Sequence, residues 1–134
     1  MKNIVETAIG SGNFQTLVMA VKKAGLVDAL TAEGPFTVFA PDDSAFAKVP
    51  EEMIDELMED GEKLKKVLTY HVADGKTMSD DLFDGEMIET LEGEKLMVKM
   101  GNNKVMIDNA IVKKADIECS NGVIHIVDTV LLPK

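Results

Sequence analysis

The chain has 134 residues, of which 46% are hydrophobic and 28% charged, the balance of an ordinary globular protein, and its length predicts one domain over residues 1–134. Its formal net charge of −10 argues against nucleic acid and anionic membrane surfaces as partners, because both attract clustered Lys and Arg. The single cysteine, Cys119, excludes an intrachain disulfide, and no apolar run approaches the ~20 residues that insertion into a membrane requires.

The opening of the chain predicts helices. Apolar residues recur at helical spacing over 14–24, with Asn13 as a candidate N-cap and Gly25 as a C-terminal stop. A short helical turn is expected over 26–30, after which Gly34-Pro35 breaks the chain.

A short strand and three further helices are predicted next. Residues 36–40 have the pattern of a buried strand, which Pro41 closes. Asp42 begins a helix, since an acidic residue is favourable at the positive end of the helix dipole. An acidic helix over 51–59 is expected to end at Gly61, and the helix after it carries on one face Leu64, Val67, Leu68 and His71.

The second half predicts strands. Residues 95–100 alternate, with Leu96, Val98 and Met100 on one side, and 104–107 continue the alternation after a turn over 101–103. Asn121-Gly122 is a turn signal, and 123–132 is apolar enough for a central strand. Helices followed by strands indicate an α+β fold.

Three ordered segments resemble the conserved boxes of the fasciclin domain family. They are FTVFAPDDSAF at 36–46, LTYHV at 68–72 and NGVIHIVD at 121–128, and the residues before them fit the family's N-terminal helices. Within these boxes a structural role is assigned to Thr37, Phe39, Pro41, Asp42, Phe46, Asn121, Gly122, His125 and Asp128. The resemblance implies a bent β-wedge of mixed strands with a bundle of short helices packed to one side, in the free-standing form seen in prokaryotes.

The same resemblance implies a non-catalytic module that mediates cell–cell or cell–matrix adhesion. Its partner would be a cell-surface or matrix protein or glycan, and the protein would be a monomer without cofactor or metal. The expected location is extracellular, periplasmic or at the cell surface. The first residues lack the apolar region of a leader peptide, so either a leader has been removed or the protein stays inside.

Two residue pairs match family positions linked to partner contact. Tyr70-His71 matches the Tyr-His pair linked to cell-surface receptors, although the apolar stripe around His71 also fits a core histidine with a satisfied hydrogen bond. Asp116-Ile117 resembles an Asp-Ile pair implicated in integrin contact, although Lys114-Ala115 precedes it where the animal motif has Glu-Pro. A loop acid beside a packing isoleucine is the alternative there.

His125, between two isoleucines, is also expected in the core. A histidine that is buried in its neutral form has a lowered pKa, so the protein is expected to lose stability toward acid pH.

Two other functions stay open at this point. A pocket between the wedge and the helices would make the protein a carrier of a small hydrophobic ligand such as a lipid or porphyrin. A pair of Cys119 with His71 or His125 would make it a hydrolase, although no activating signature surrounds the thiol. The methionines are interpreted as core or core-edge residues, namely Met53, Met58, Met97, Met100 and Met106.

Overall fold

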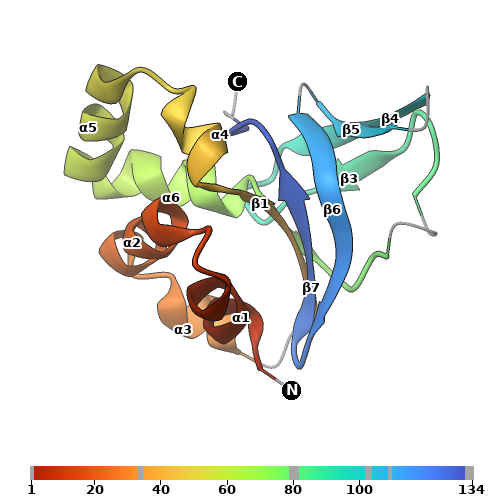
Figure 1. Ribbon diagram of the computed structural model, residues 1–134, viewed down its shortest axis with the longest axis horizontal. Coiled ribbons are helices and arrows are strands. Elements are labelled where there is room, and N and C mark those ends of the chain that lie inside the picture. The colour runs from red at the N-terminus through yellow and green to blue at the C-terminus, as the bar shows by residue number, and fades with distance from the viewer. Residues whose placement is uncertain (1, 33–34, 79–81, 102–103, 109, 132–134) are drawn as a thin grey trace.

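The computed structural model describes residues 2–32, 35–78, 82–101, 104–108 and 110–131. Helices gather on one side of a bent sheet, and the far strands of the sheet lie away from them (Figure 1). The elements in chain order are α1 (Ile4–Ser11), α2 (Gln15–Ala24), α3 (Val27–Thr31), β1 (Phe36–Pro41), α4 (Asp43–Ala47), α5 (Glu51–Glu59), α6 (Gly61–Thr69), β2 (Val72–Asp74), β3 (Met87–Glu89), β4 (Lys95–Gly101), β5 (Lys104–Ile107), β6 (Ala110–Cys119) and β7 (Gly122–Val127).

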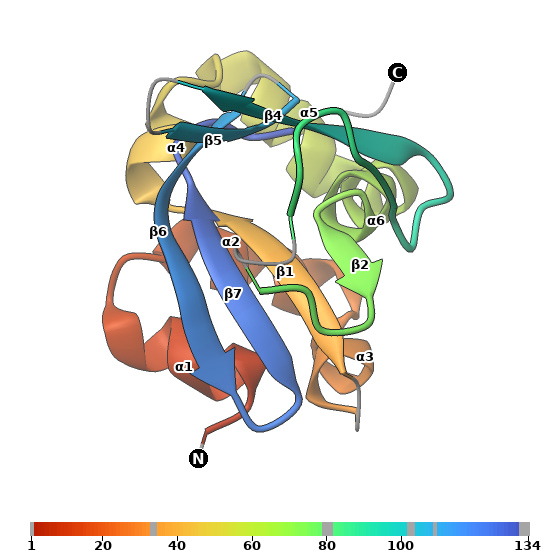
Figure 2. The same cartoon turned by 90° about the vertical axis from the view of Figure 1, so that its right-hand side faces the viewer.

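The described strands form a mixed sheet in the order β2-β1-β7-β6-β5-β4-β3. Among them only the pair of β1 with β7 is parallel, and each of the other neighbouring pairs is antiparallel. A bridge between Ala73 and Thr90 brings the two ends of the sheet together, so that the wedge nearly closes on itself (Figure 2). The predicted α+β class and the mixed, bent wedge are confirmed.

Two hydrophobic cores lie on opposite faces of β1. Val38 and Ala40 point into the helix-side core, which also contains Leu17, Val21, Leu68 and Ile124. Phe39, between them, points into the wedge core, with Tyr70, Leu96, Val98, Ile107 and Val127. Because side chains alternate along a strand, one buried strand serves both cores, which explains why Val38, Phe39 and Ala40 are all apolar.

The helix α2 is capped from a distance rather than by its own neighbour. The prediction of Asn13 as N-cap is wrong, because Phe14 holds that position and makes no side-chain cap. Instead the carboxylate of Asp43 accepts hydrogen bonds from the main-chain N–H groups of Gln15 and Thr16, at 3.3 and 3.0 Å. The N–H of Asp43 in turn donates to the carbonyl of Asn13 at 2.8 Å. The prediction of Gly25 as the stop is confirmed, with φ of 74°.

Asp60, and not Gly61, separates α5 from α6. Its N–H donates to the carbonyl of Glu56 and ends α5, while its Oδ1 accepts from the N–H groups of Glu62 and Lys63 and begins α6. Gly61 is therefore the first residue of α6, because a carboxylate cap outweighs the turn preference of glycine there. α5 itself has the predicted bounds.

The C-terminal strands differ most from the prediction. β4 and β5 lie where the alternation predicted them, although residues 102–103 of the predicted turn are outside the described part. β7 ends at Val127 and not at 132, because Asp128 turns back to exchange hydrogen bonds with Ile111 through its N–H and its Oδ1. β6 was not predicted, since register shifts within it interrupt the alternation.

Candidate binding surface

Tyr70 and His71, adjacent in sequence, serve different cores. The Tyr70 ring is 1% exposed in the wedge core, and its hydroxyl donates to Asp108 Oδ2 at 2.8 Å. Asp108 Oδ1 accepts from the N–H of Met97, so this carboxylate joins the end of α6 to β4. Burial, followed by the nearby Asp108 carboxylate, raises the pKa of the Tyr70 hydroxyl far above its ordinary value.

His71 lies just past the end of α6 and is fully enclosed. Its ring is 2% exposed, Nδ1–H donates to the Val67 carbonyl at 2.7 Å, and Nε2 accepts from the Leu131 N–H at 2.8 Å. Burial lowers the pKa of the imidazole to about 4, which keeps the ring neutral at ordinary pH. The interpretation of His71 as a core histidine is confirmed, and partner contact by this pair stays a prediction.

His125 joins three segments inside the wedge. Its Nε2–H donates to the carbonyl of Thr77 at 2.8 Å, and its Nδ1 accepts from the N–H of Asp116 at 3.2 Å. The ring stacks on Phe39, with centroids 5.6 Å apart, and is 1% exposed. Its predicted place in the core is confirmed.

Asp116 and Ile117 lie within β6, not in a loop as the alternative interpretation held. Asp116 has φ of 61° at a register shift of the strand, and its carboxylate Oδ1 is 3.9 Å from His125 Nδ1. Ile117 is half-buried against the helix-side core. About a third of the Asp116 side chain is exposed (33%), so this pair offers a partner little more than one carboxylate.

The remaining box residues tie distant segments together. Thr37 Oγ1 donates to the Gly75 carbonyl at 2.6 Å and accepts from the Thr77 N–H at 2.8 Å. Asp42 caps α4 through the Ala45 N–H and pairs with Lys113 at 2.7 Å. The buried side chains of Pro41 and Phe46 lie at the end of β1 and in α4.

Asn121 and Gly122 hold the turn between β6 and β7 against the helices. The Asn121 amide donates to the carbonyls of Leu30 and Ala32, and its oxygen accepts from the Ile4 N–H. A Cβ on Gly122 would lie 2.1 Å from the Phe36 carbonyl oxygen, so only glycine allows β1 to approach.

The thiol and the two imidazoles do not form a catalytic group. Cys119 is buried, and its Sγ is 3.6 Å from the Ile117 carbonyl. The ring nitrogens of His71 and His125 are each engaged with main-chain groups, so neither is placed to take a proton from the thiol. Within the described ranges, no group of three metal-ligating side chains is found, and no helix is long and apolar enough to cross a membrane.

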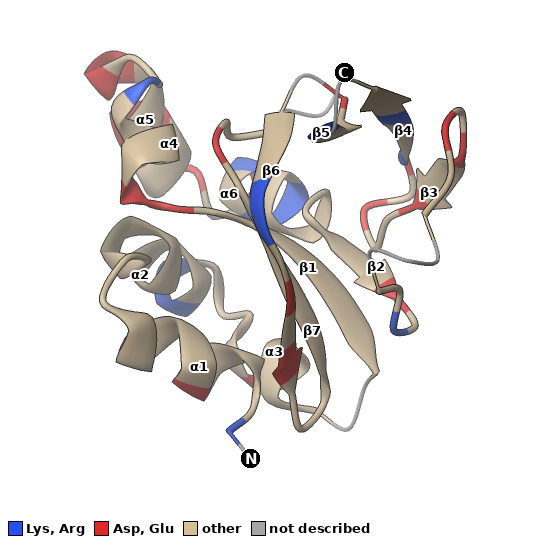
Figure 3. Ribbon diagram, turned by 45° about the vertical axis from the view of Figure 1, so that its right-hand side comes forward, with Lys and Arg blue, Asp and Glu red and all other residues tan. Residues whose placement is uncertain are grey.

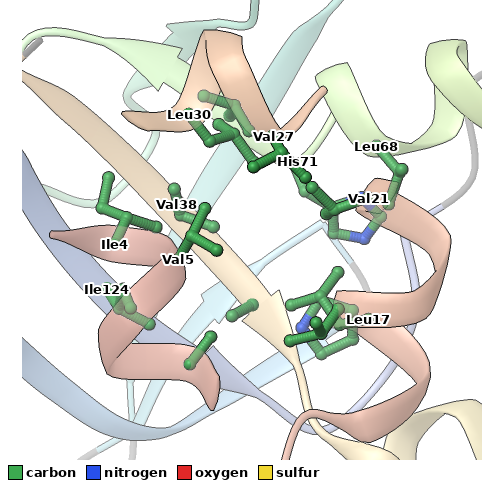
Figure 4. Close-up of a pocket in the computed structure, with 15 residues that line it drawn as sticks. Ile4, Val5, Leu17, Val21, Val27, Leu30, Val38, Leu68, His71 and Ile124 are labelled. Carbon is green, nitrogen blue, oxygen red and sulfur yellow. The ribbon is translucent and has the colours of Figure 1, made fainter. Parts of the chain in front are cut away.

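A small apolar cavity lies between α1, α2, α3 and the sheet (Figure 4). It has a volume of about 30 Å³ and is lined by apolar side chains such as Val5, Val21 and Leu30, with His71 at one wall. Pockets for small molecules typically occupy ~300–1,000 Å³. The cavity is therefore far too small for a lipid or porphyrin, and it gives no support to the carrier alternative.

Exposed apolar side chains also lie on the outer face of the sheet at β3, β4 and β5, which we call the outer sheet face. The register places Met87 opposite Met97, Lys99 opposite Met106, and Met106 opposite Ile111, all pointing away from the wedge core. Met87 and Met97 are 49% and 39% exposed. By the same alternation the face also carries Glu89, Lys95, Lys99 and Lys104.

Three lysines against one carboxylate, Glu89, leave the outer sheet face with a local positive charge on an acidic protein. Lys95, Lys99 and Lys104 are exposed, and among the described residues none of them forms an ion pair. Figure 3 shows blue on β4 and β5, red on α5, and further red on the segments beside β3. Flexible methionines between cations are the side-chain types that can contact both apolar and acidic groups.

Sequence reasoning missed this surface although the signal was present. The alternation that places Leu96 and Val98 inward also places Met97 outward with Lys95 and Lys99. The interpretation of the methionines as core residues is wrong for three of them, since Met53, Met97 and Met100 are 37%, 39% and 40% exposed. Met58 and Met106 are half-buried, as expected at the edge of a core.

Comparisons with known proteins agree with this architecture. The protein-family model "Fasciclin domain" matches residues 12–133. Two Synechocystis proteins are similar: Protein sll1483 is 50% identical, over 97% of this chain and 73% of its own, and uncharacterized protein sll1735 is 44% identical over 98% of both. The cell surface glycolipoprotein MPB83 of Mycobacterium bovis is 39% identical over 81% of this chain and 48% of its own.

The same fold occurs in a solved structure, a FAS1 domain pair from the insect cell adhesion molecule fasciclin I. The match has a TM-score of 0.79 at 20% identity, over 98% of this chain and 51% of the other. The ordered boxes, the wedge with its helices and the family match over nearly the whole chain lead to one conclusion: this chain belongs to the fasciclin domain family.

Proposed function

We propose that this protein is a non-catalytic binding module, located outside the cytoplasm, that mediates adhesion through the outer sheet face. The observation that carries the proposal is the contrast between the boxes and this face. The box side chains are engaged in internal hydrogen bonds and packing, whereas Met87, Met97 and three lysines without an ion pair among the described residues point outward. The partner would be a surface or matrix protein or a glycan.

The relatives support the same location and role. One relative is named a cell surface glycolipoprotein, and the solved structure comes from a protein named a cell adhesion molecule. An exposed apolar patch rimmed by charged groups is the usual mark of an interaction site. The methionines supply adaptable apolar contact, and the lysines select partners that carry negative charge.

Adhesion of coated beads to intact source cells and to their extracellular matrix tests the proposal. Replacing Met87 and Met97 with Asp should reduce binding about tenfold, which corresponds to a loss of about 1.4 kcal/mol at the contact. Both side chains are exposed, so the fold should persist, as circular dichroism would report.

The matched control replaces Ile9 and Met19, which are 54% and 56% exposed on α1 and α2. Their change to Asp adds the same charge on a different surface. Equal losses from both pairs of substitutions would argue against the outer sheet face, and beads without affinity for cells or matrix would argue against adhesion itself. Protease treatment of intact cells, followed by immunodetection, tests the location.

A further inference from the structure

The helix α5 is an unusual element because it lies on the surface with none of its residues buried. Its nine residues carry five exposed carboxylates and no basic side chain, and among the described residues none of the five forms an ion pair. They are Glu51, Glu52, Asp55, Glu56 and Glu59. Met53, beside them, is 37% exposed.

The charges of α5 complement those of the outer sheet face. One surface combines carboxylates with an exposed methionine, and the other combines three lysines and a single carboxylate, Glu89, with exposed methionines. The two surfaces lie at opposite ends of the molecule, with α5 on the left and β4 on the right in Figure 1. They therefore cannot meet within one copy of the chain, but they can meet between two copies.

The dimensions of the two surfaces also agree. Lys95 and Lys99 are four residues apart on a strand, about 13 Å at the usual rise. Glu52 and Glu59 are seven residues apart and return to the same side of the helix, about 10 Å along its axis. The flexible lysine side chains cover the difference of about 3 Å.

We propose that a second copy of this chain is the partner, with α5 of one molecule docked on the outer sheet face of the next. This inference names the partner of the surface proposed above and rests on that proposal. The contact is heterologous, because it joins two different surfaces, so repeated docking produces chains of molecules rather than a closed dimer. The monomer expected from the sequence would then hold only at low concentration.

The net charge of −10 opposes association, but it does not cancel the local attraction. At about 0.15 M salt the Debye length is ~8 Å, so charges at the far ends of two docked molecules are largely screened while touching groups are not. The methionines exclude water from part of the contact, which strengthens the ion pairs around them. A small contact of this kind gives weak association between two copies. The overall avidity increases when many copies are displayed on a surface and many contacts form at once.

Sedimentation velocity at about 0.15 M salt, with the protein concentration raised toward about 1 mM, tests the proposal. The average mass of the wild-type chain should rise with concentration. Two charge-reversed variants should remain monomeric: the sheet variant Lys95→Glu, Lys99→Glu, Lys104→Glu and the helix variant Asp55→Lys, Glu56→Lys, Glu59→Lys. An equimolar mixture of the two should associate again, because each restores opposite charges across the contact.

Net charge alone does not produce this result. Each reversal changes the net charge by two, so the sheet variant carries about −16 and the helix variant about −4, and the mixture still consists of two negative proteins. The matched control reverses Lys22, Lys23 and Lys65, which are exposed on other helices, and reaches the same charge as the sheet variant. It should associate as the wild type does.

A wild-type chain that stays monomeric throughout, or a mixture of the two variants that fails to associate, would overturn the self-docking proposal. Loss of association in the control variant would also overturn it, because a general charge effect would then be responsible. The bead assay decides the adhesion proposal separately, since beads can adhere to cells through the outer sheet face without any self-association.

Discussion

At the scale of single residues, His71 links the stability of this protein to pH. The buried ring is neutral in the folded state, with its pKa lowered to about 4, while the unfolded chain takes up a proton near the ordinary histidine value of 6.5. Between these values the unfolded state binds more protons, so stability falls as the pH falls from about 6.5 to about 4. The free energy of unfolding should drop by about 3 kcal/mol across this range.

Urea denaturation at a series of pH values measures this loss, and a His71→Gln chain should have a smaller slope between pH ~6.5 and ~4, because the contribution of His71 is removed. An imidazole resonance of His71 that titrates near pH ~6.5 in the folded protein would contradict the prediction.

Tyr70 has the opposite pH dependence at the alkaline end. It is the only tyrosine of the chain, and no tryptophan is present, so tyrosinate absorbance reports this hydroxyl alone. Burial and Asp108 raise its pKa, so the unfolded state loses its proton first and stability falls above pH ~10. Absorbance and unfolding should therefore change together during alkaline titration.

A Tyr70→Phe chain should lose this alkaline slope, and it should lose about 1–2 kcal/mol at neutral pH with the hydrogen bond to Asp108. Tyrosinate that forms near pH ~10 while the fold persists would be incompatible with a buried hydroxyl.

The candidate residues were predictable from the sequence only in part. The apolar neighbours of His71 and His125 indicate burial, but two of the main-chain partners, Leu131 and Thr77, are far away in sequence. The position of Asp116 in a strand was hidden because Lys113 and Lys114 interrupt the apolar pattern just before the register shift.

At the scale of elements, the close approach of β1 to the start of β7 depends on Gly122. A Cβ there would lie 2.1 Å from the carbonyl oxygen of Phe36, and main chain cannot yield as a flexible side chain can. Gly122→Ala should therefore lower the free energy of unfolding by about 3 kcal/mol or more, as thermal or urea denaturation would measure.

Gly61→Ala is the matched control for this substitution. Gly61 begins α6, and a methyl group added there would meet no atom of another segment within 4 Å. Alanine at this position should therefore be neutral or stabilise the helix by up to about 1 kcal/mol. A Gly122→Ala chain as stable as Gly61→Ala would mean that β1 and β7 separate without cost.

The contact of α2 with α4 depends on one carboxylate. Asp43 accepts from Gln15 and Thr16, so Asp43→Ala leaves two N–H groups at the start of α2 without their cap. We expect a loss of about 1 kcal/mol in the free energy of unfolding. Ser44→Ala, at the exposed next position, should change stability by less than about 0.5 kcal/mol. Equal effects of the two substitutions in urea denaturation would contradict the capping role.

Elements with a local signal were predictable, and elements that depend on distant partners were not. Gly25 is a local stop signal for α2, and the run 51–59 has the apolar and acidic pattern of a surface helix. Both elements lie where they were expected. The cap of α2 belongs to Asp43, which follows it by many residues, and so Asn13 was chosen wrongly. The end of β7 is likewise set by Ile111 on another strand.

At the scale of the whole molecule, the family boxes made the fold predictable, but they did not make the proposed outer sheet face predictable. The boxes contain residues that build the wedge core and fix the helices to the sheet, such as Phe39 and Asn121, so their order indicates the wedge and its helices. The outer sheet face lies outside the boxes on β3, β4 and β5. Its residues, including Met97, became recognisable only when the strand register placed them side by side.

The parallel pair of β1 and β7 joins segments that are far apart in the sequence. The side-chain oxygen of Asn121 likewise accepts a hydrogen bond from the N–H of Ile4, which is 117 positions earlier. Neither core can close until β7 has been synthesised, because β7 is the neighbour of β1 on the side away from β2. Such long-range pairing makes folding slow and late. A growing chain therefore lacks a complete core and stays accessible to chaperones until β7 has been made.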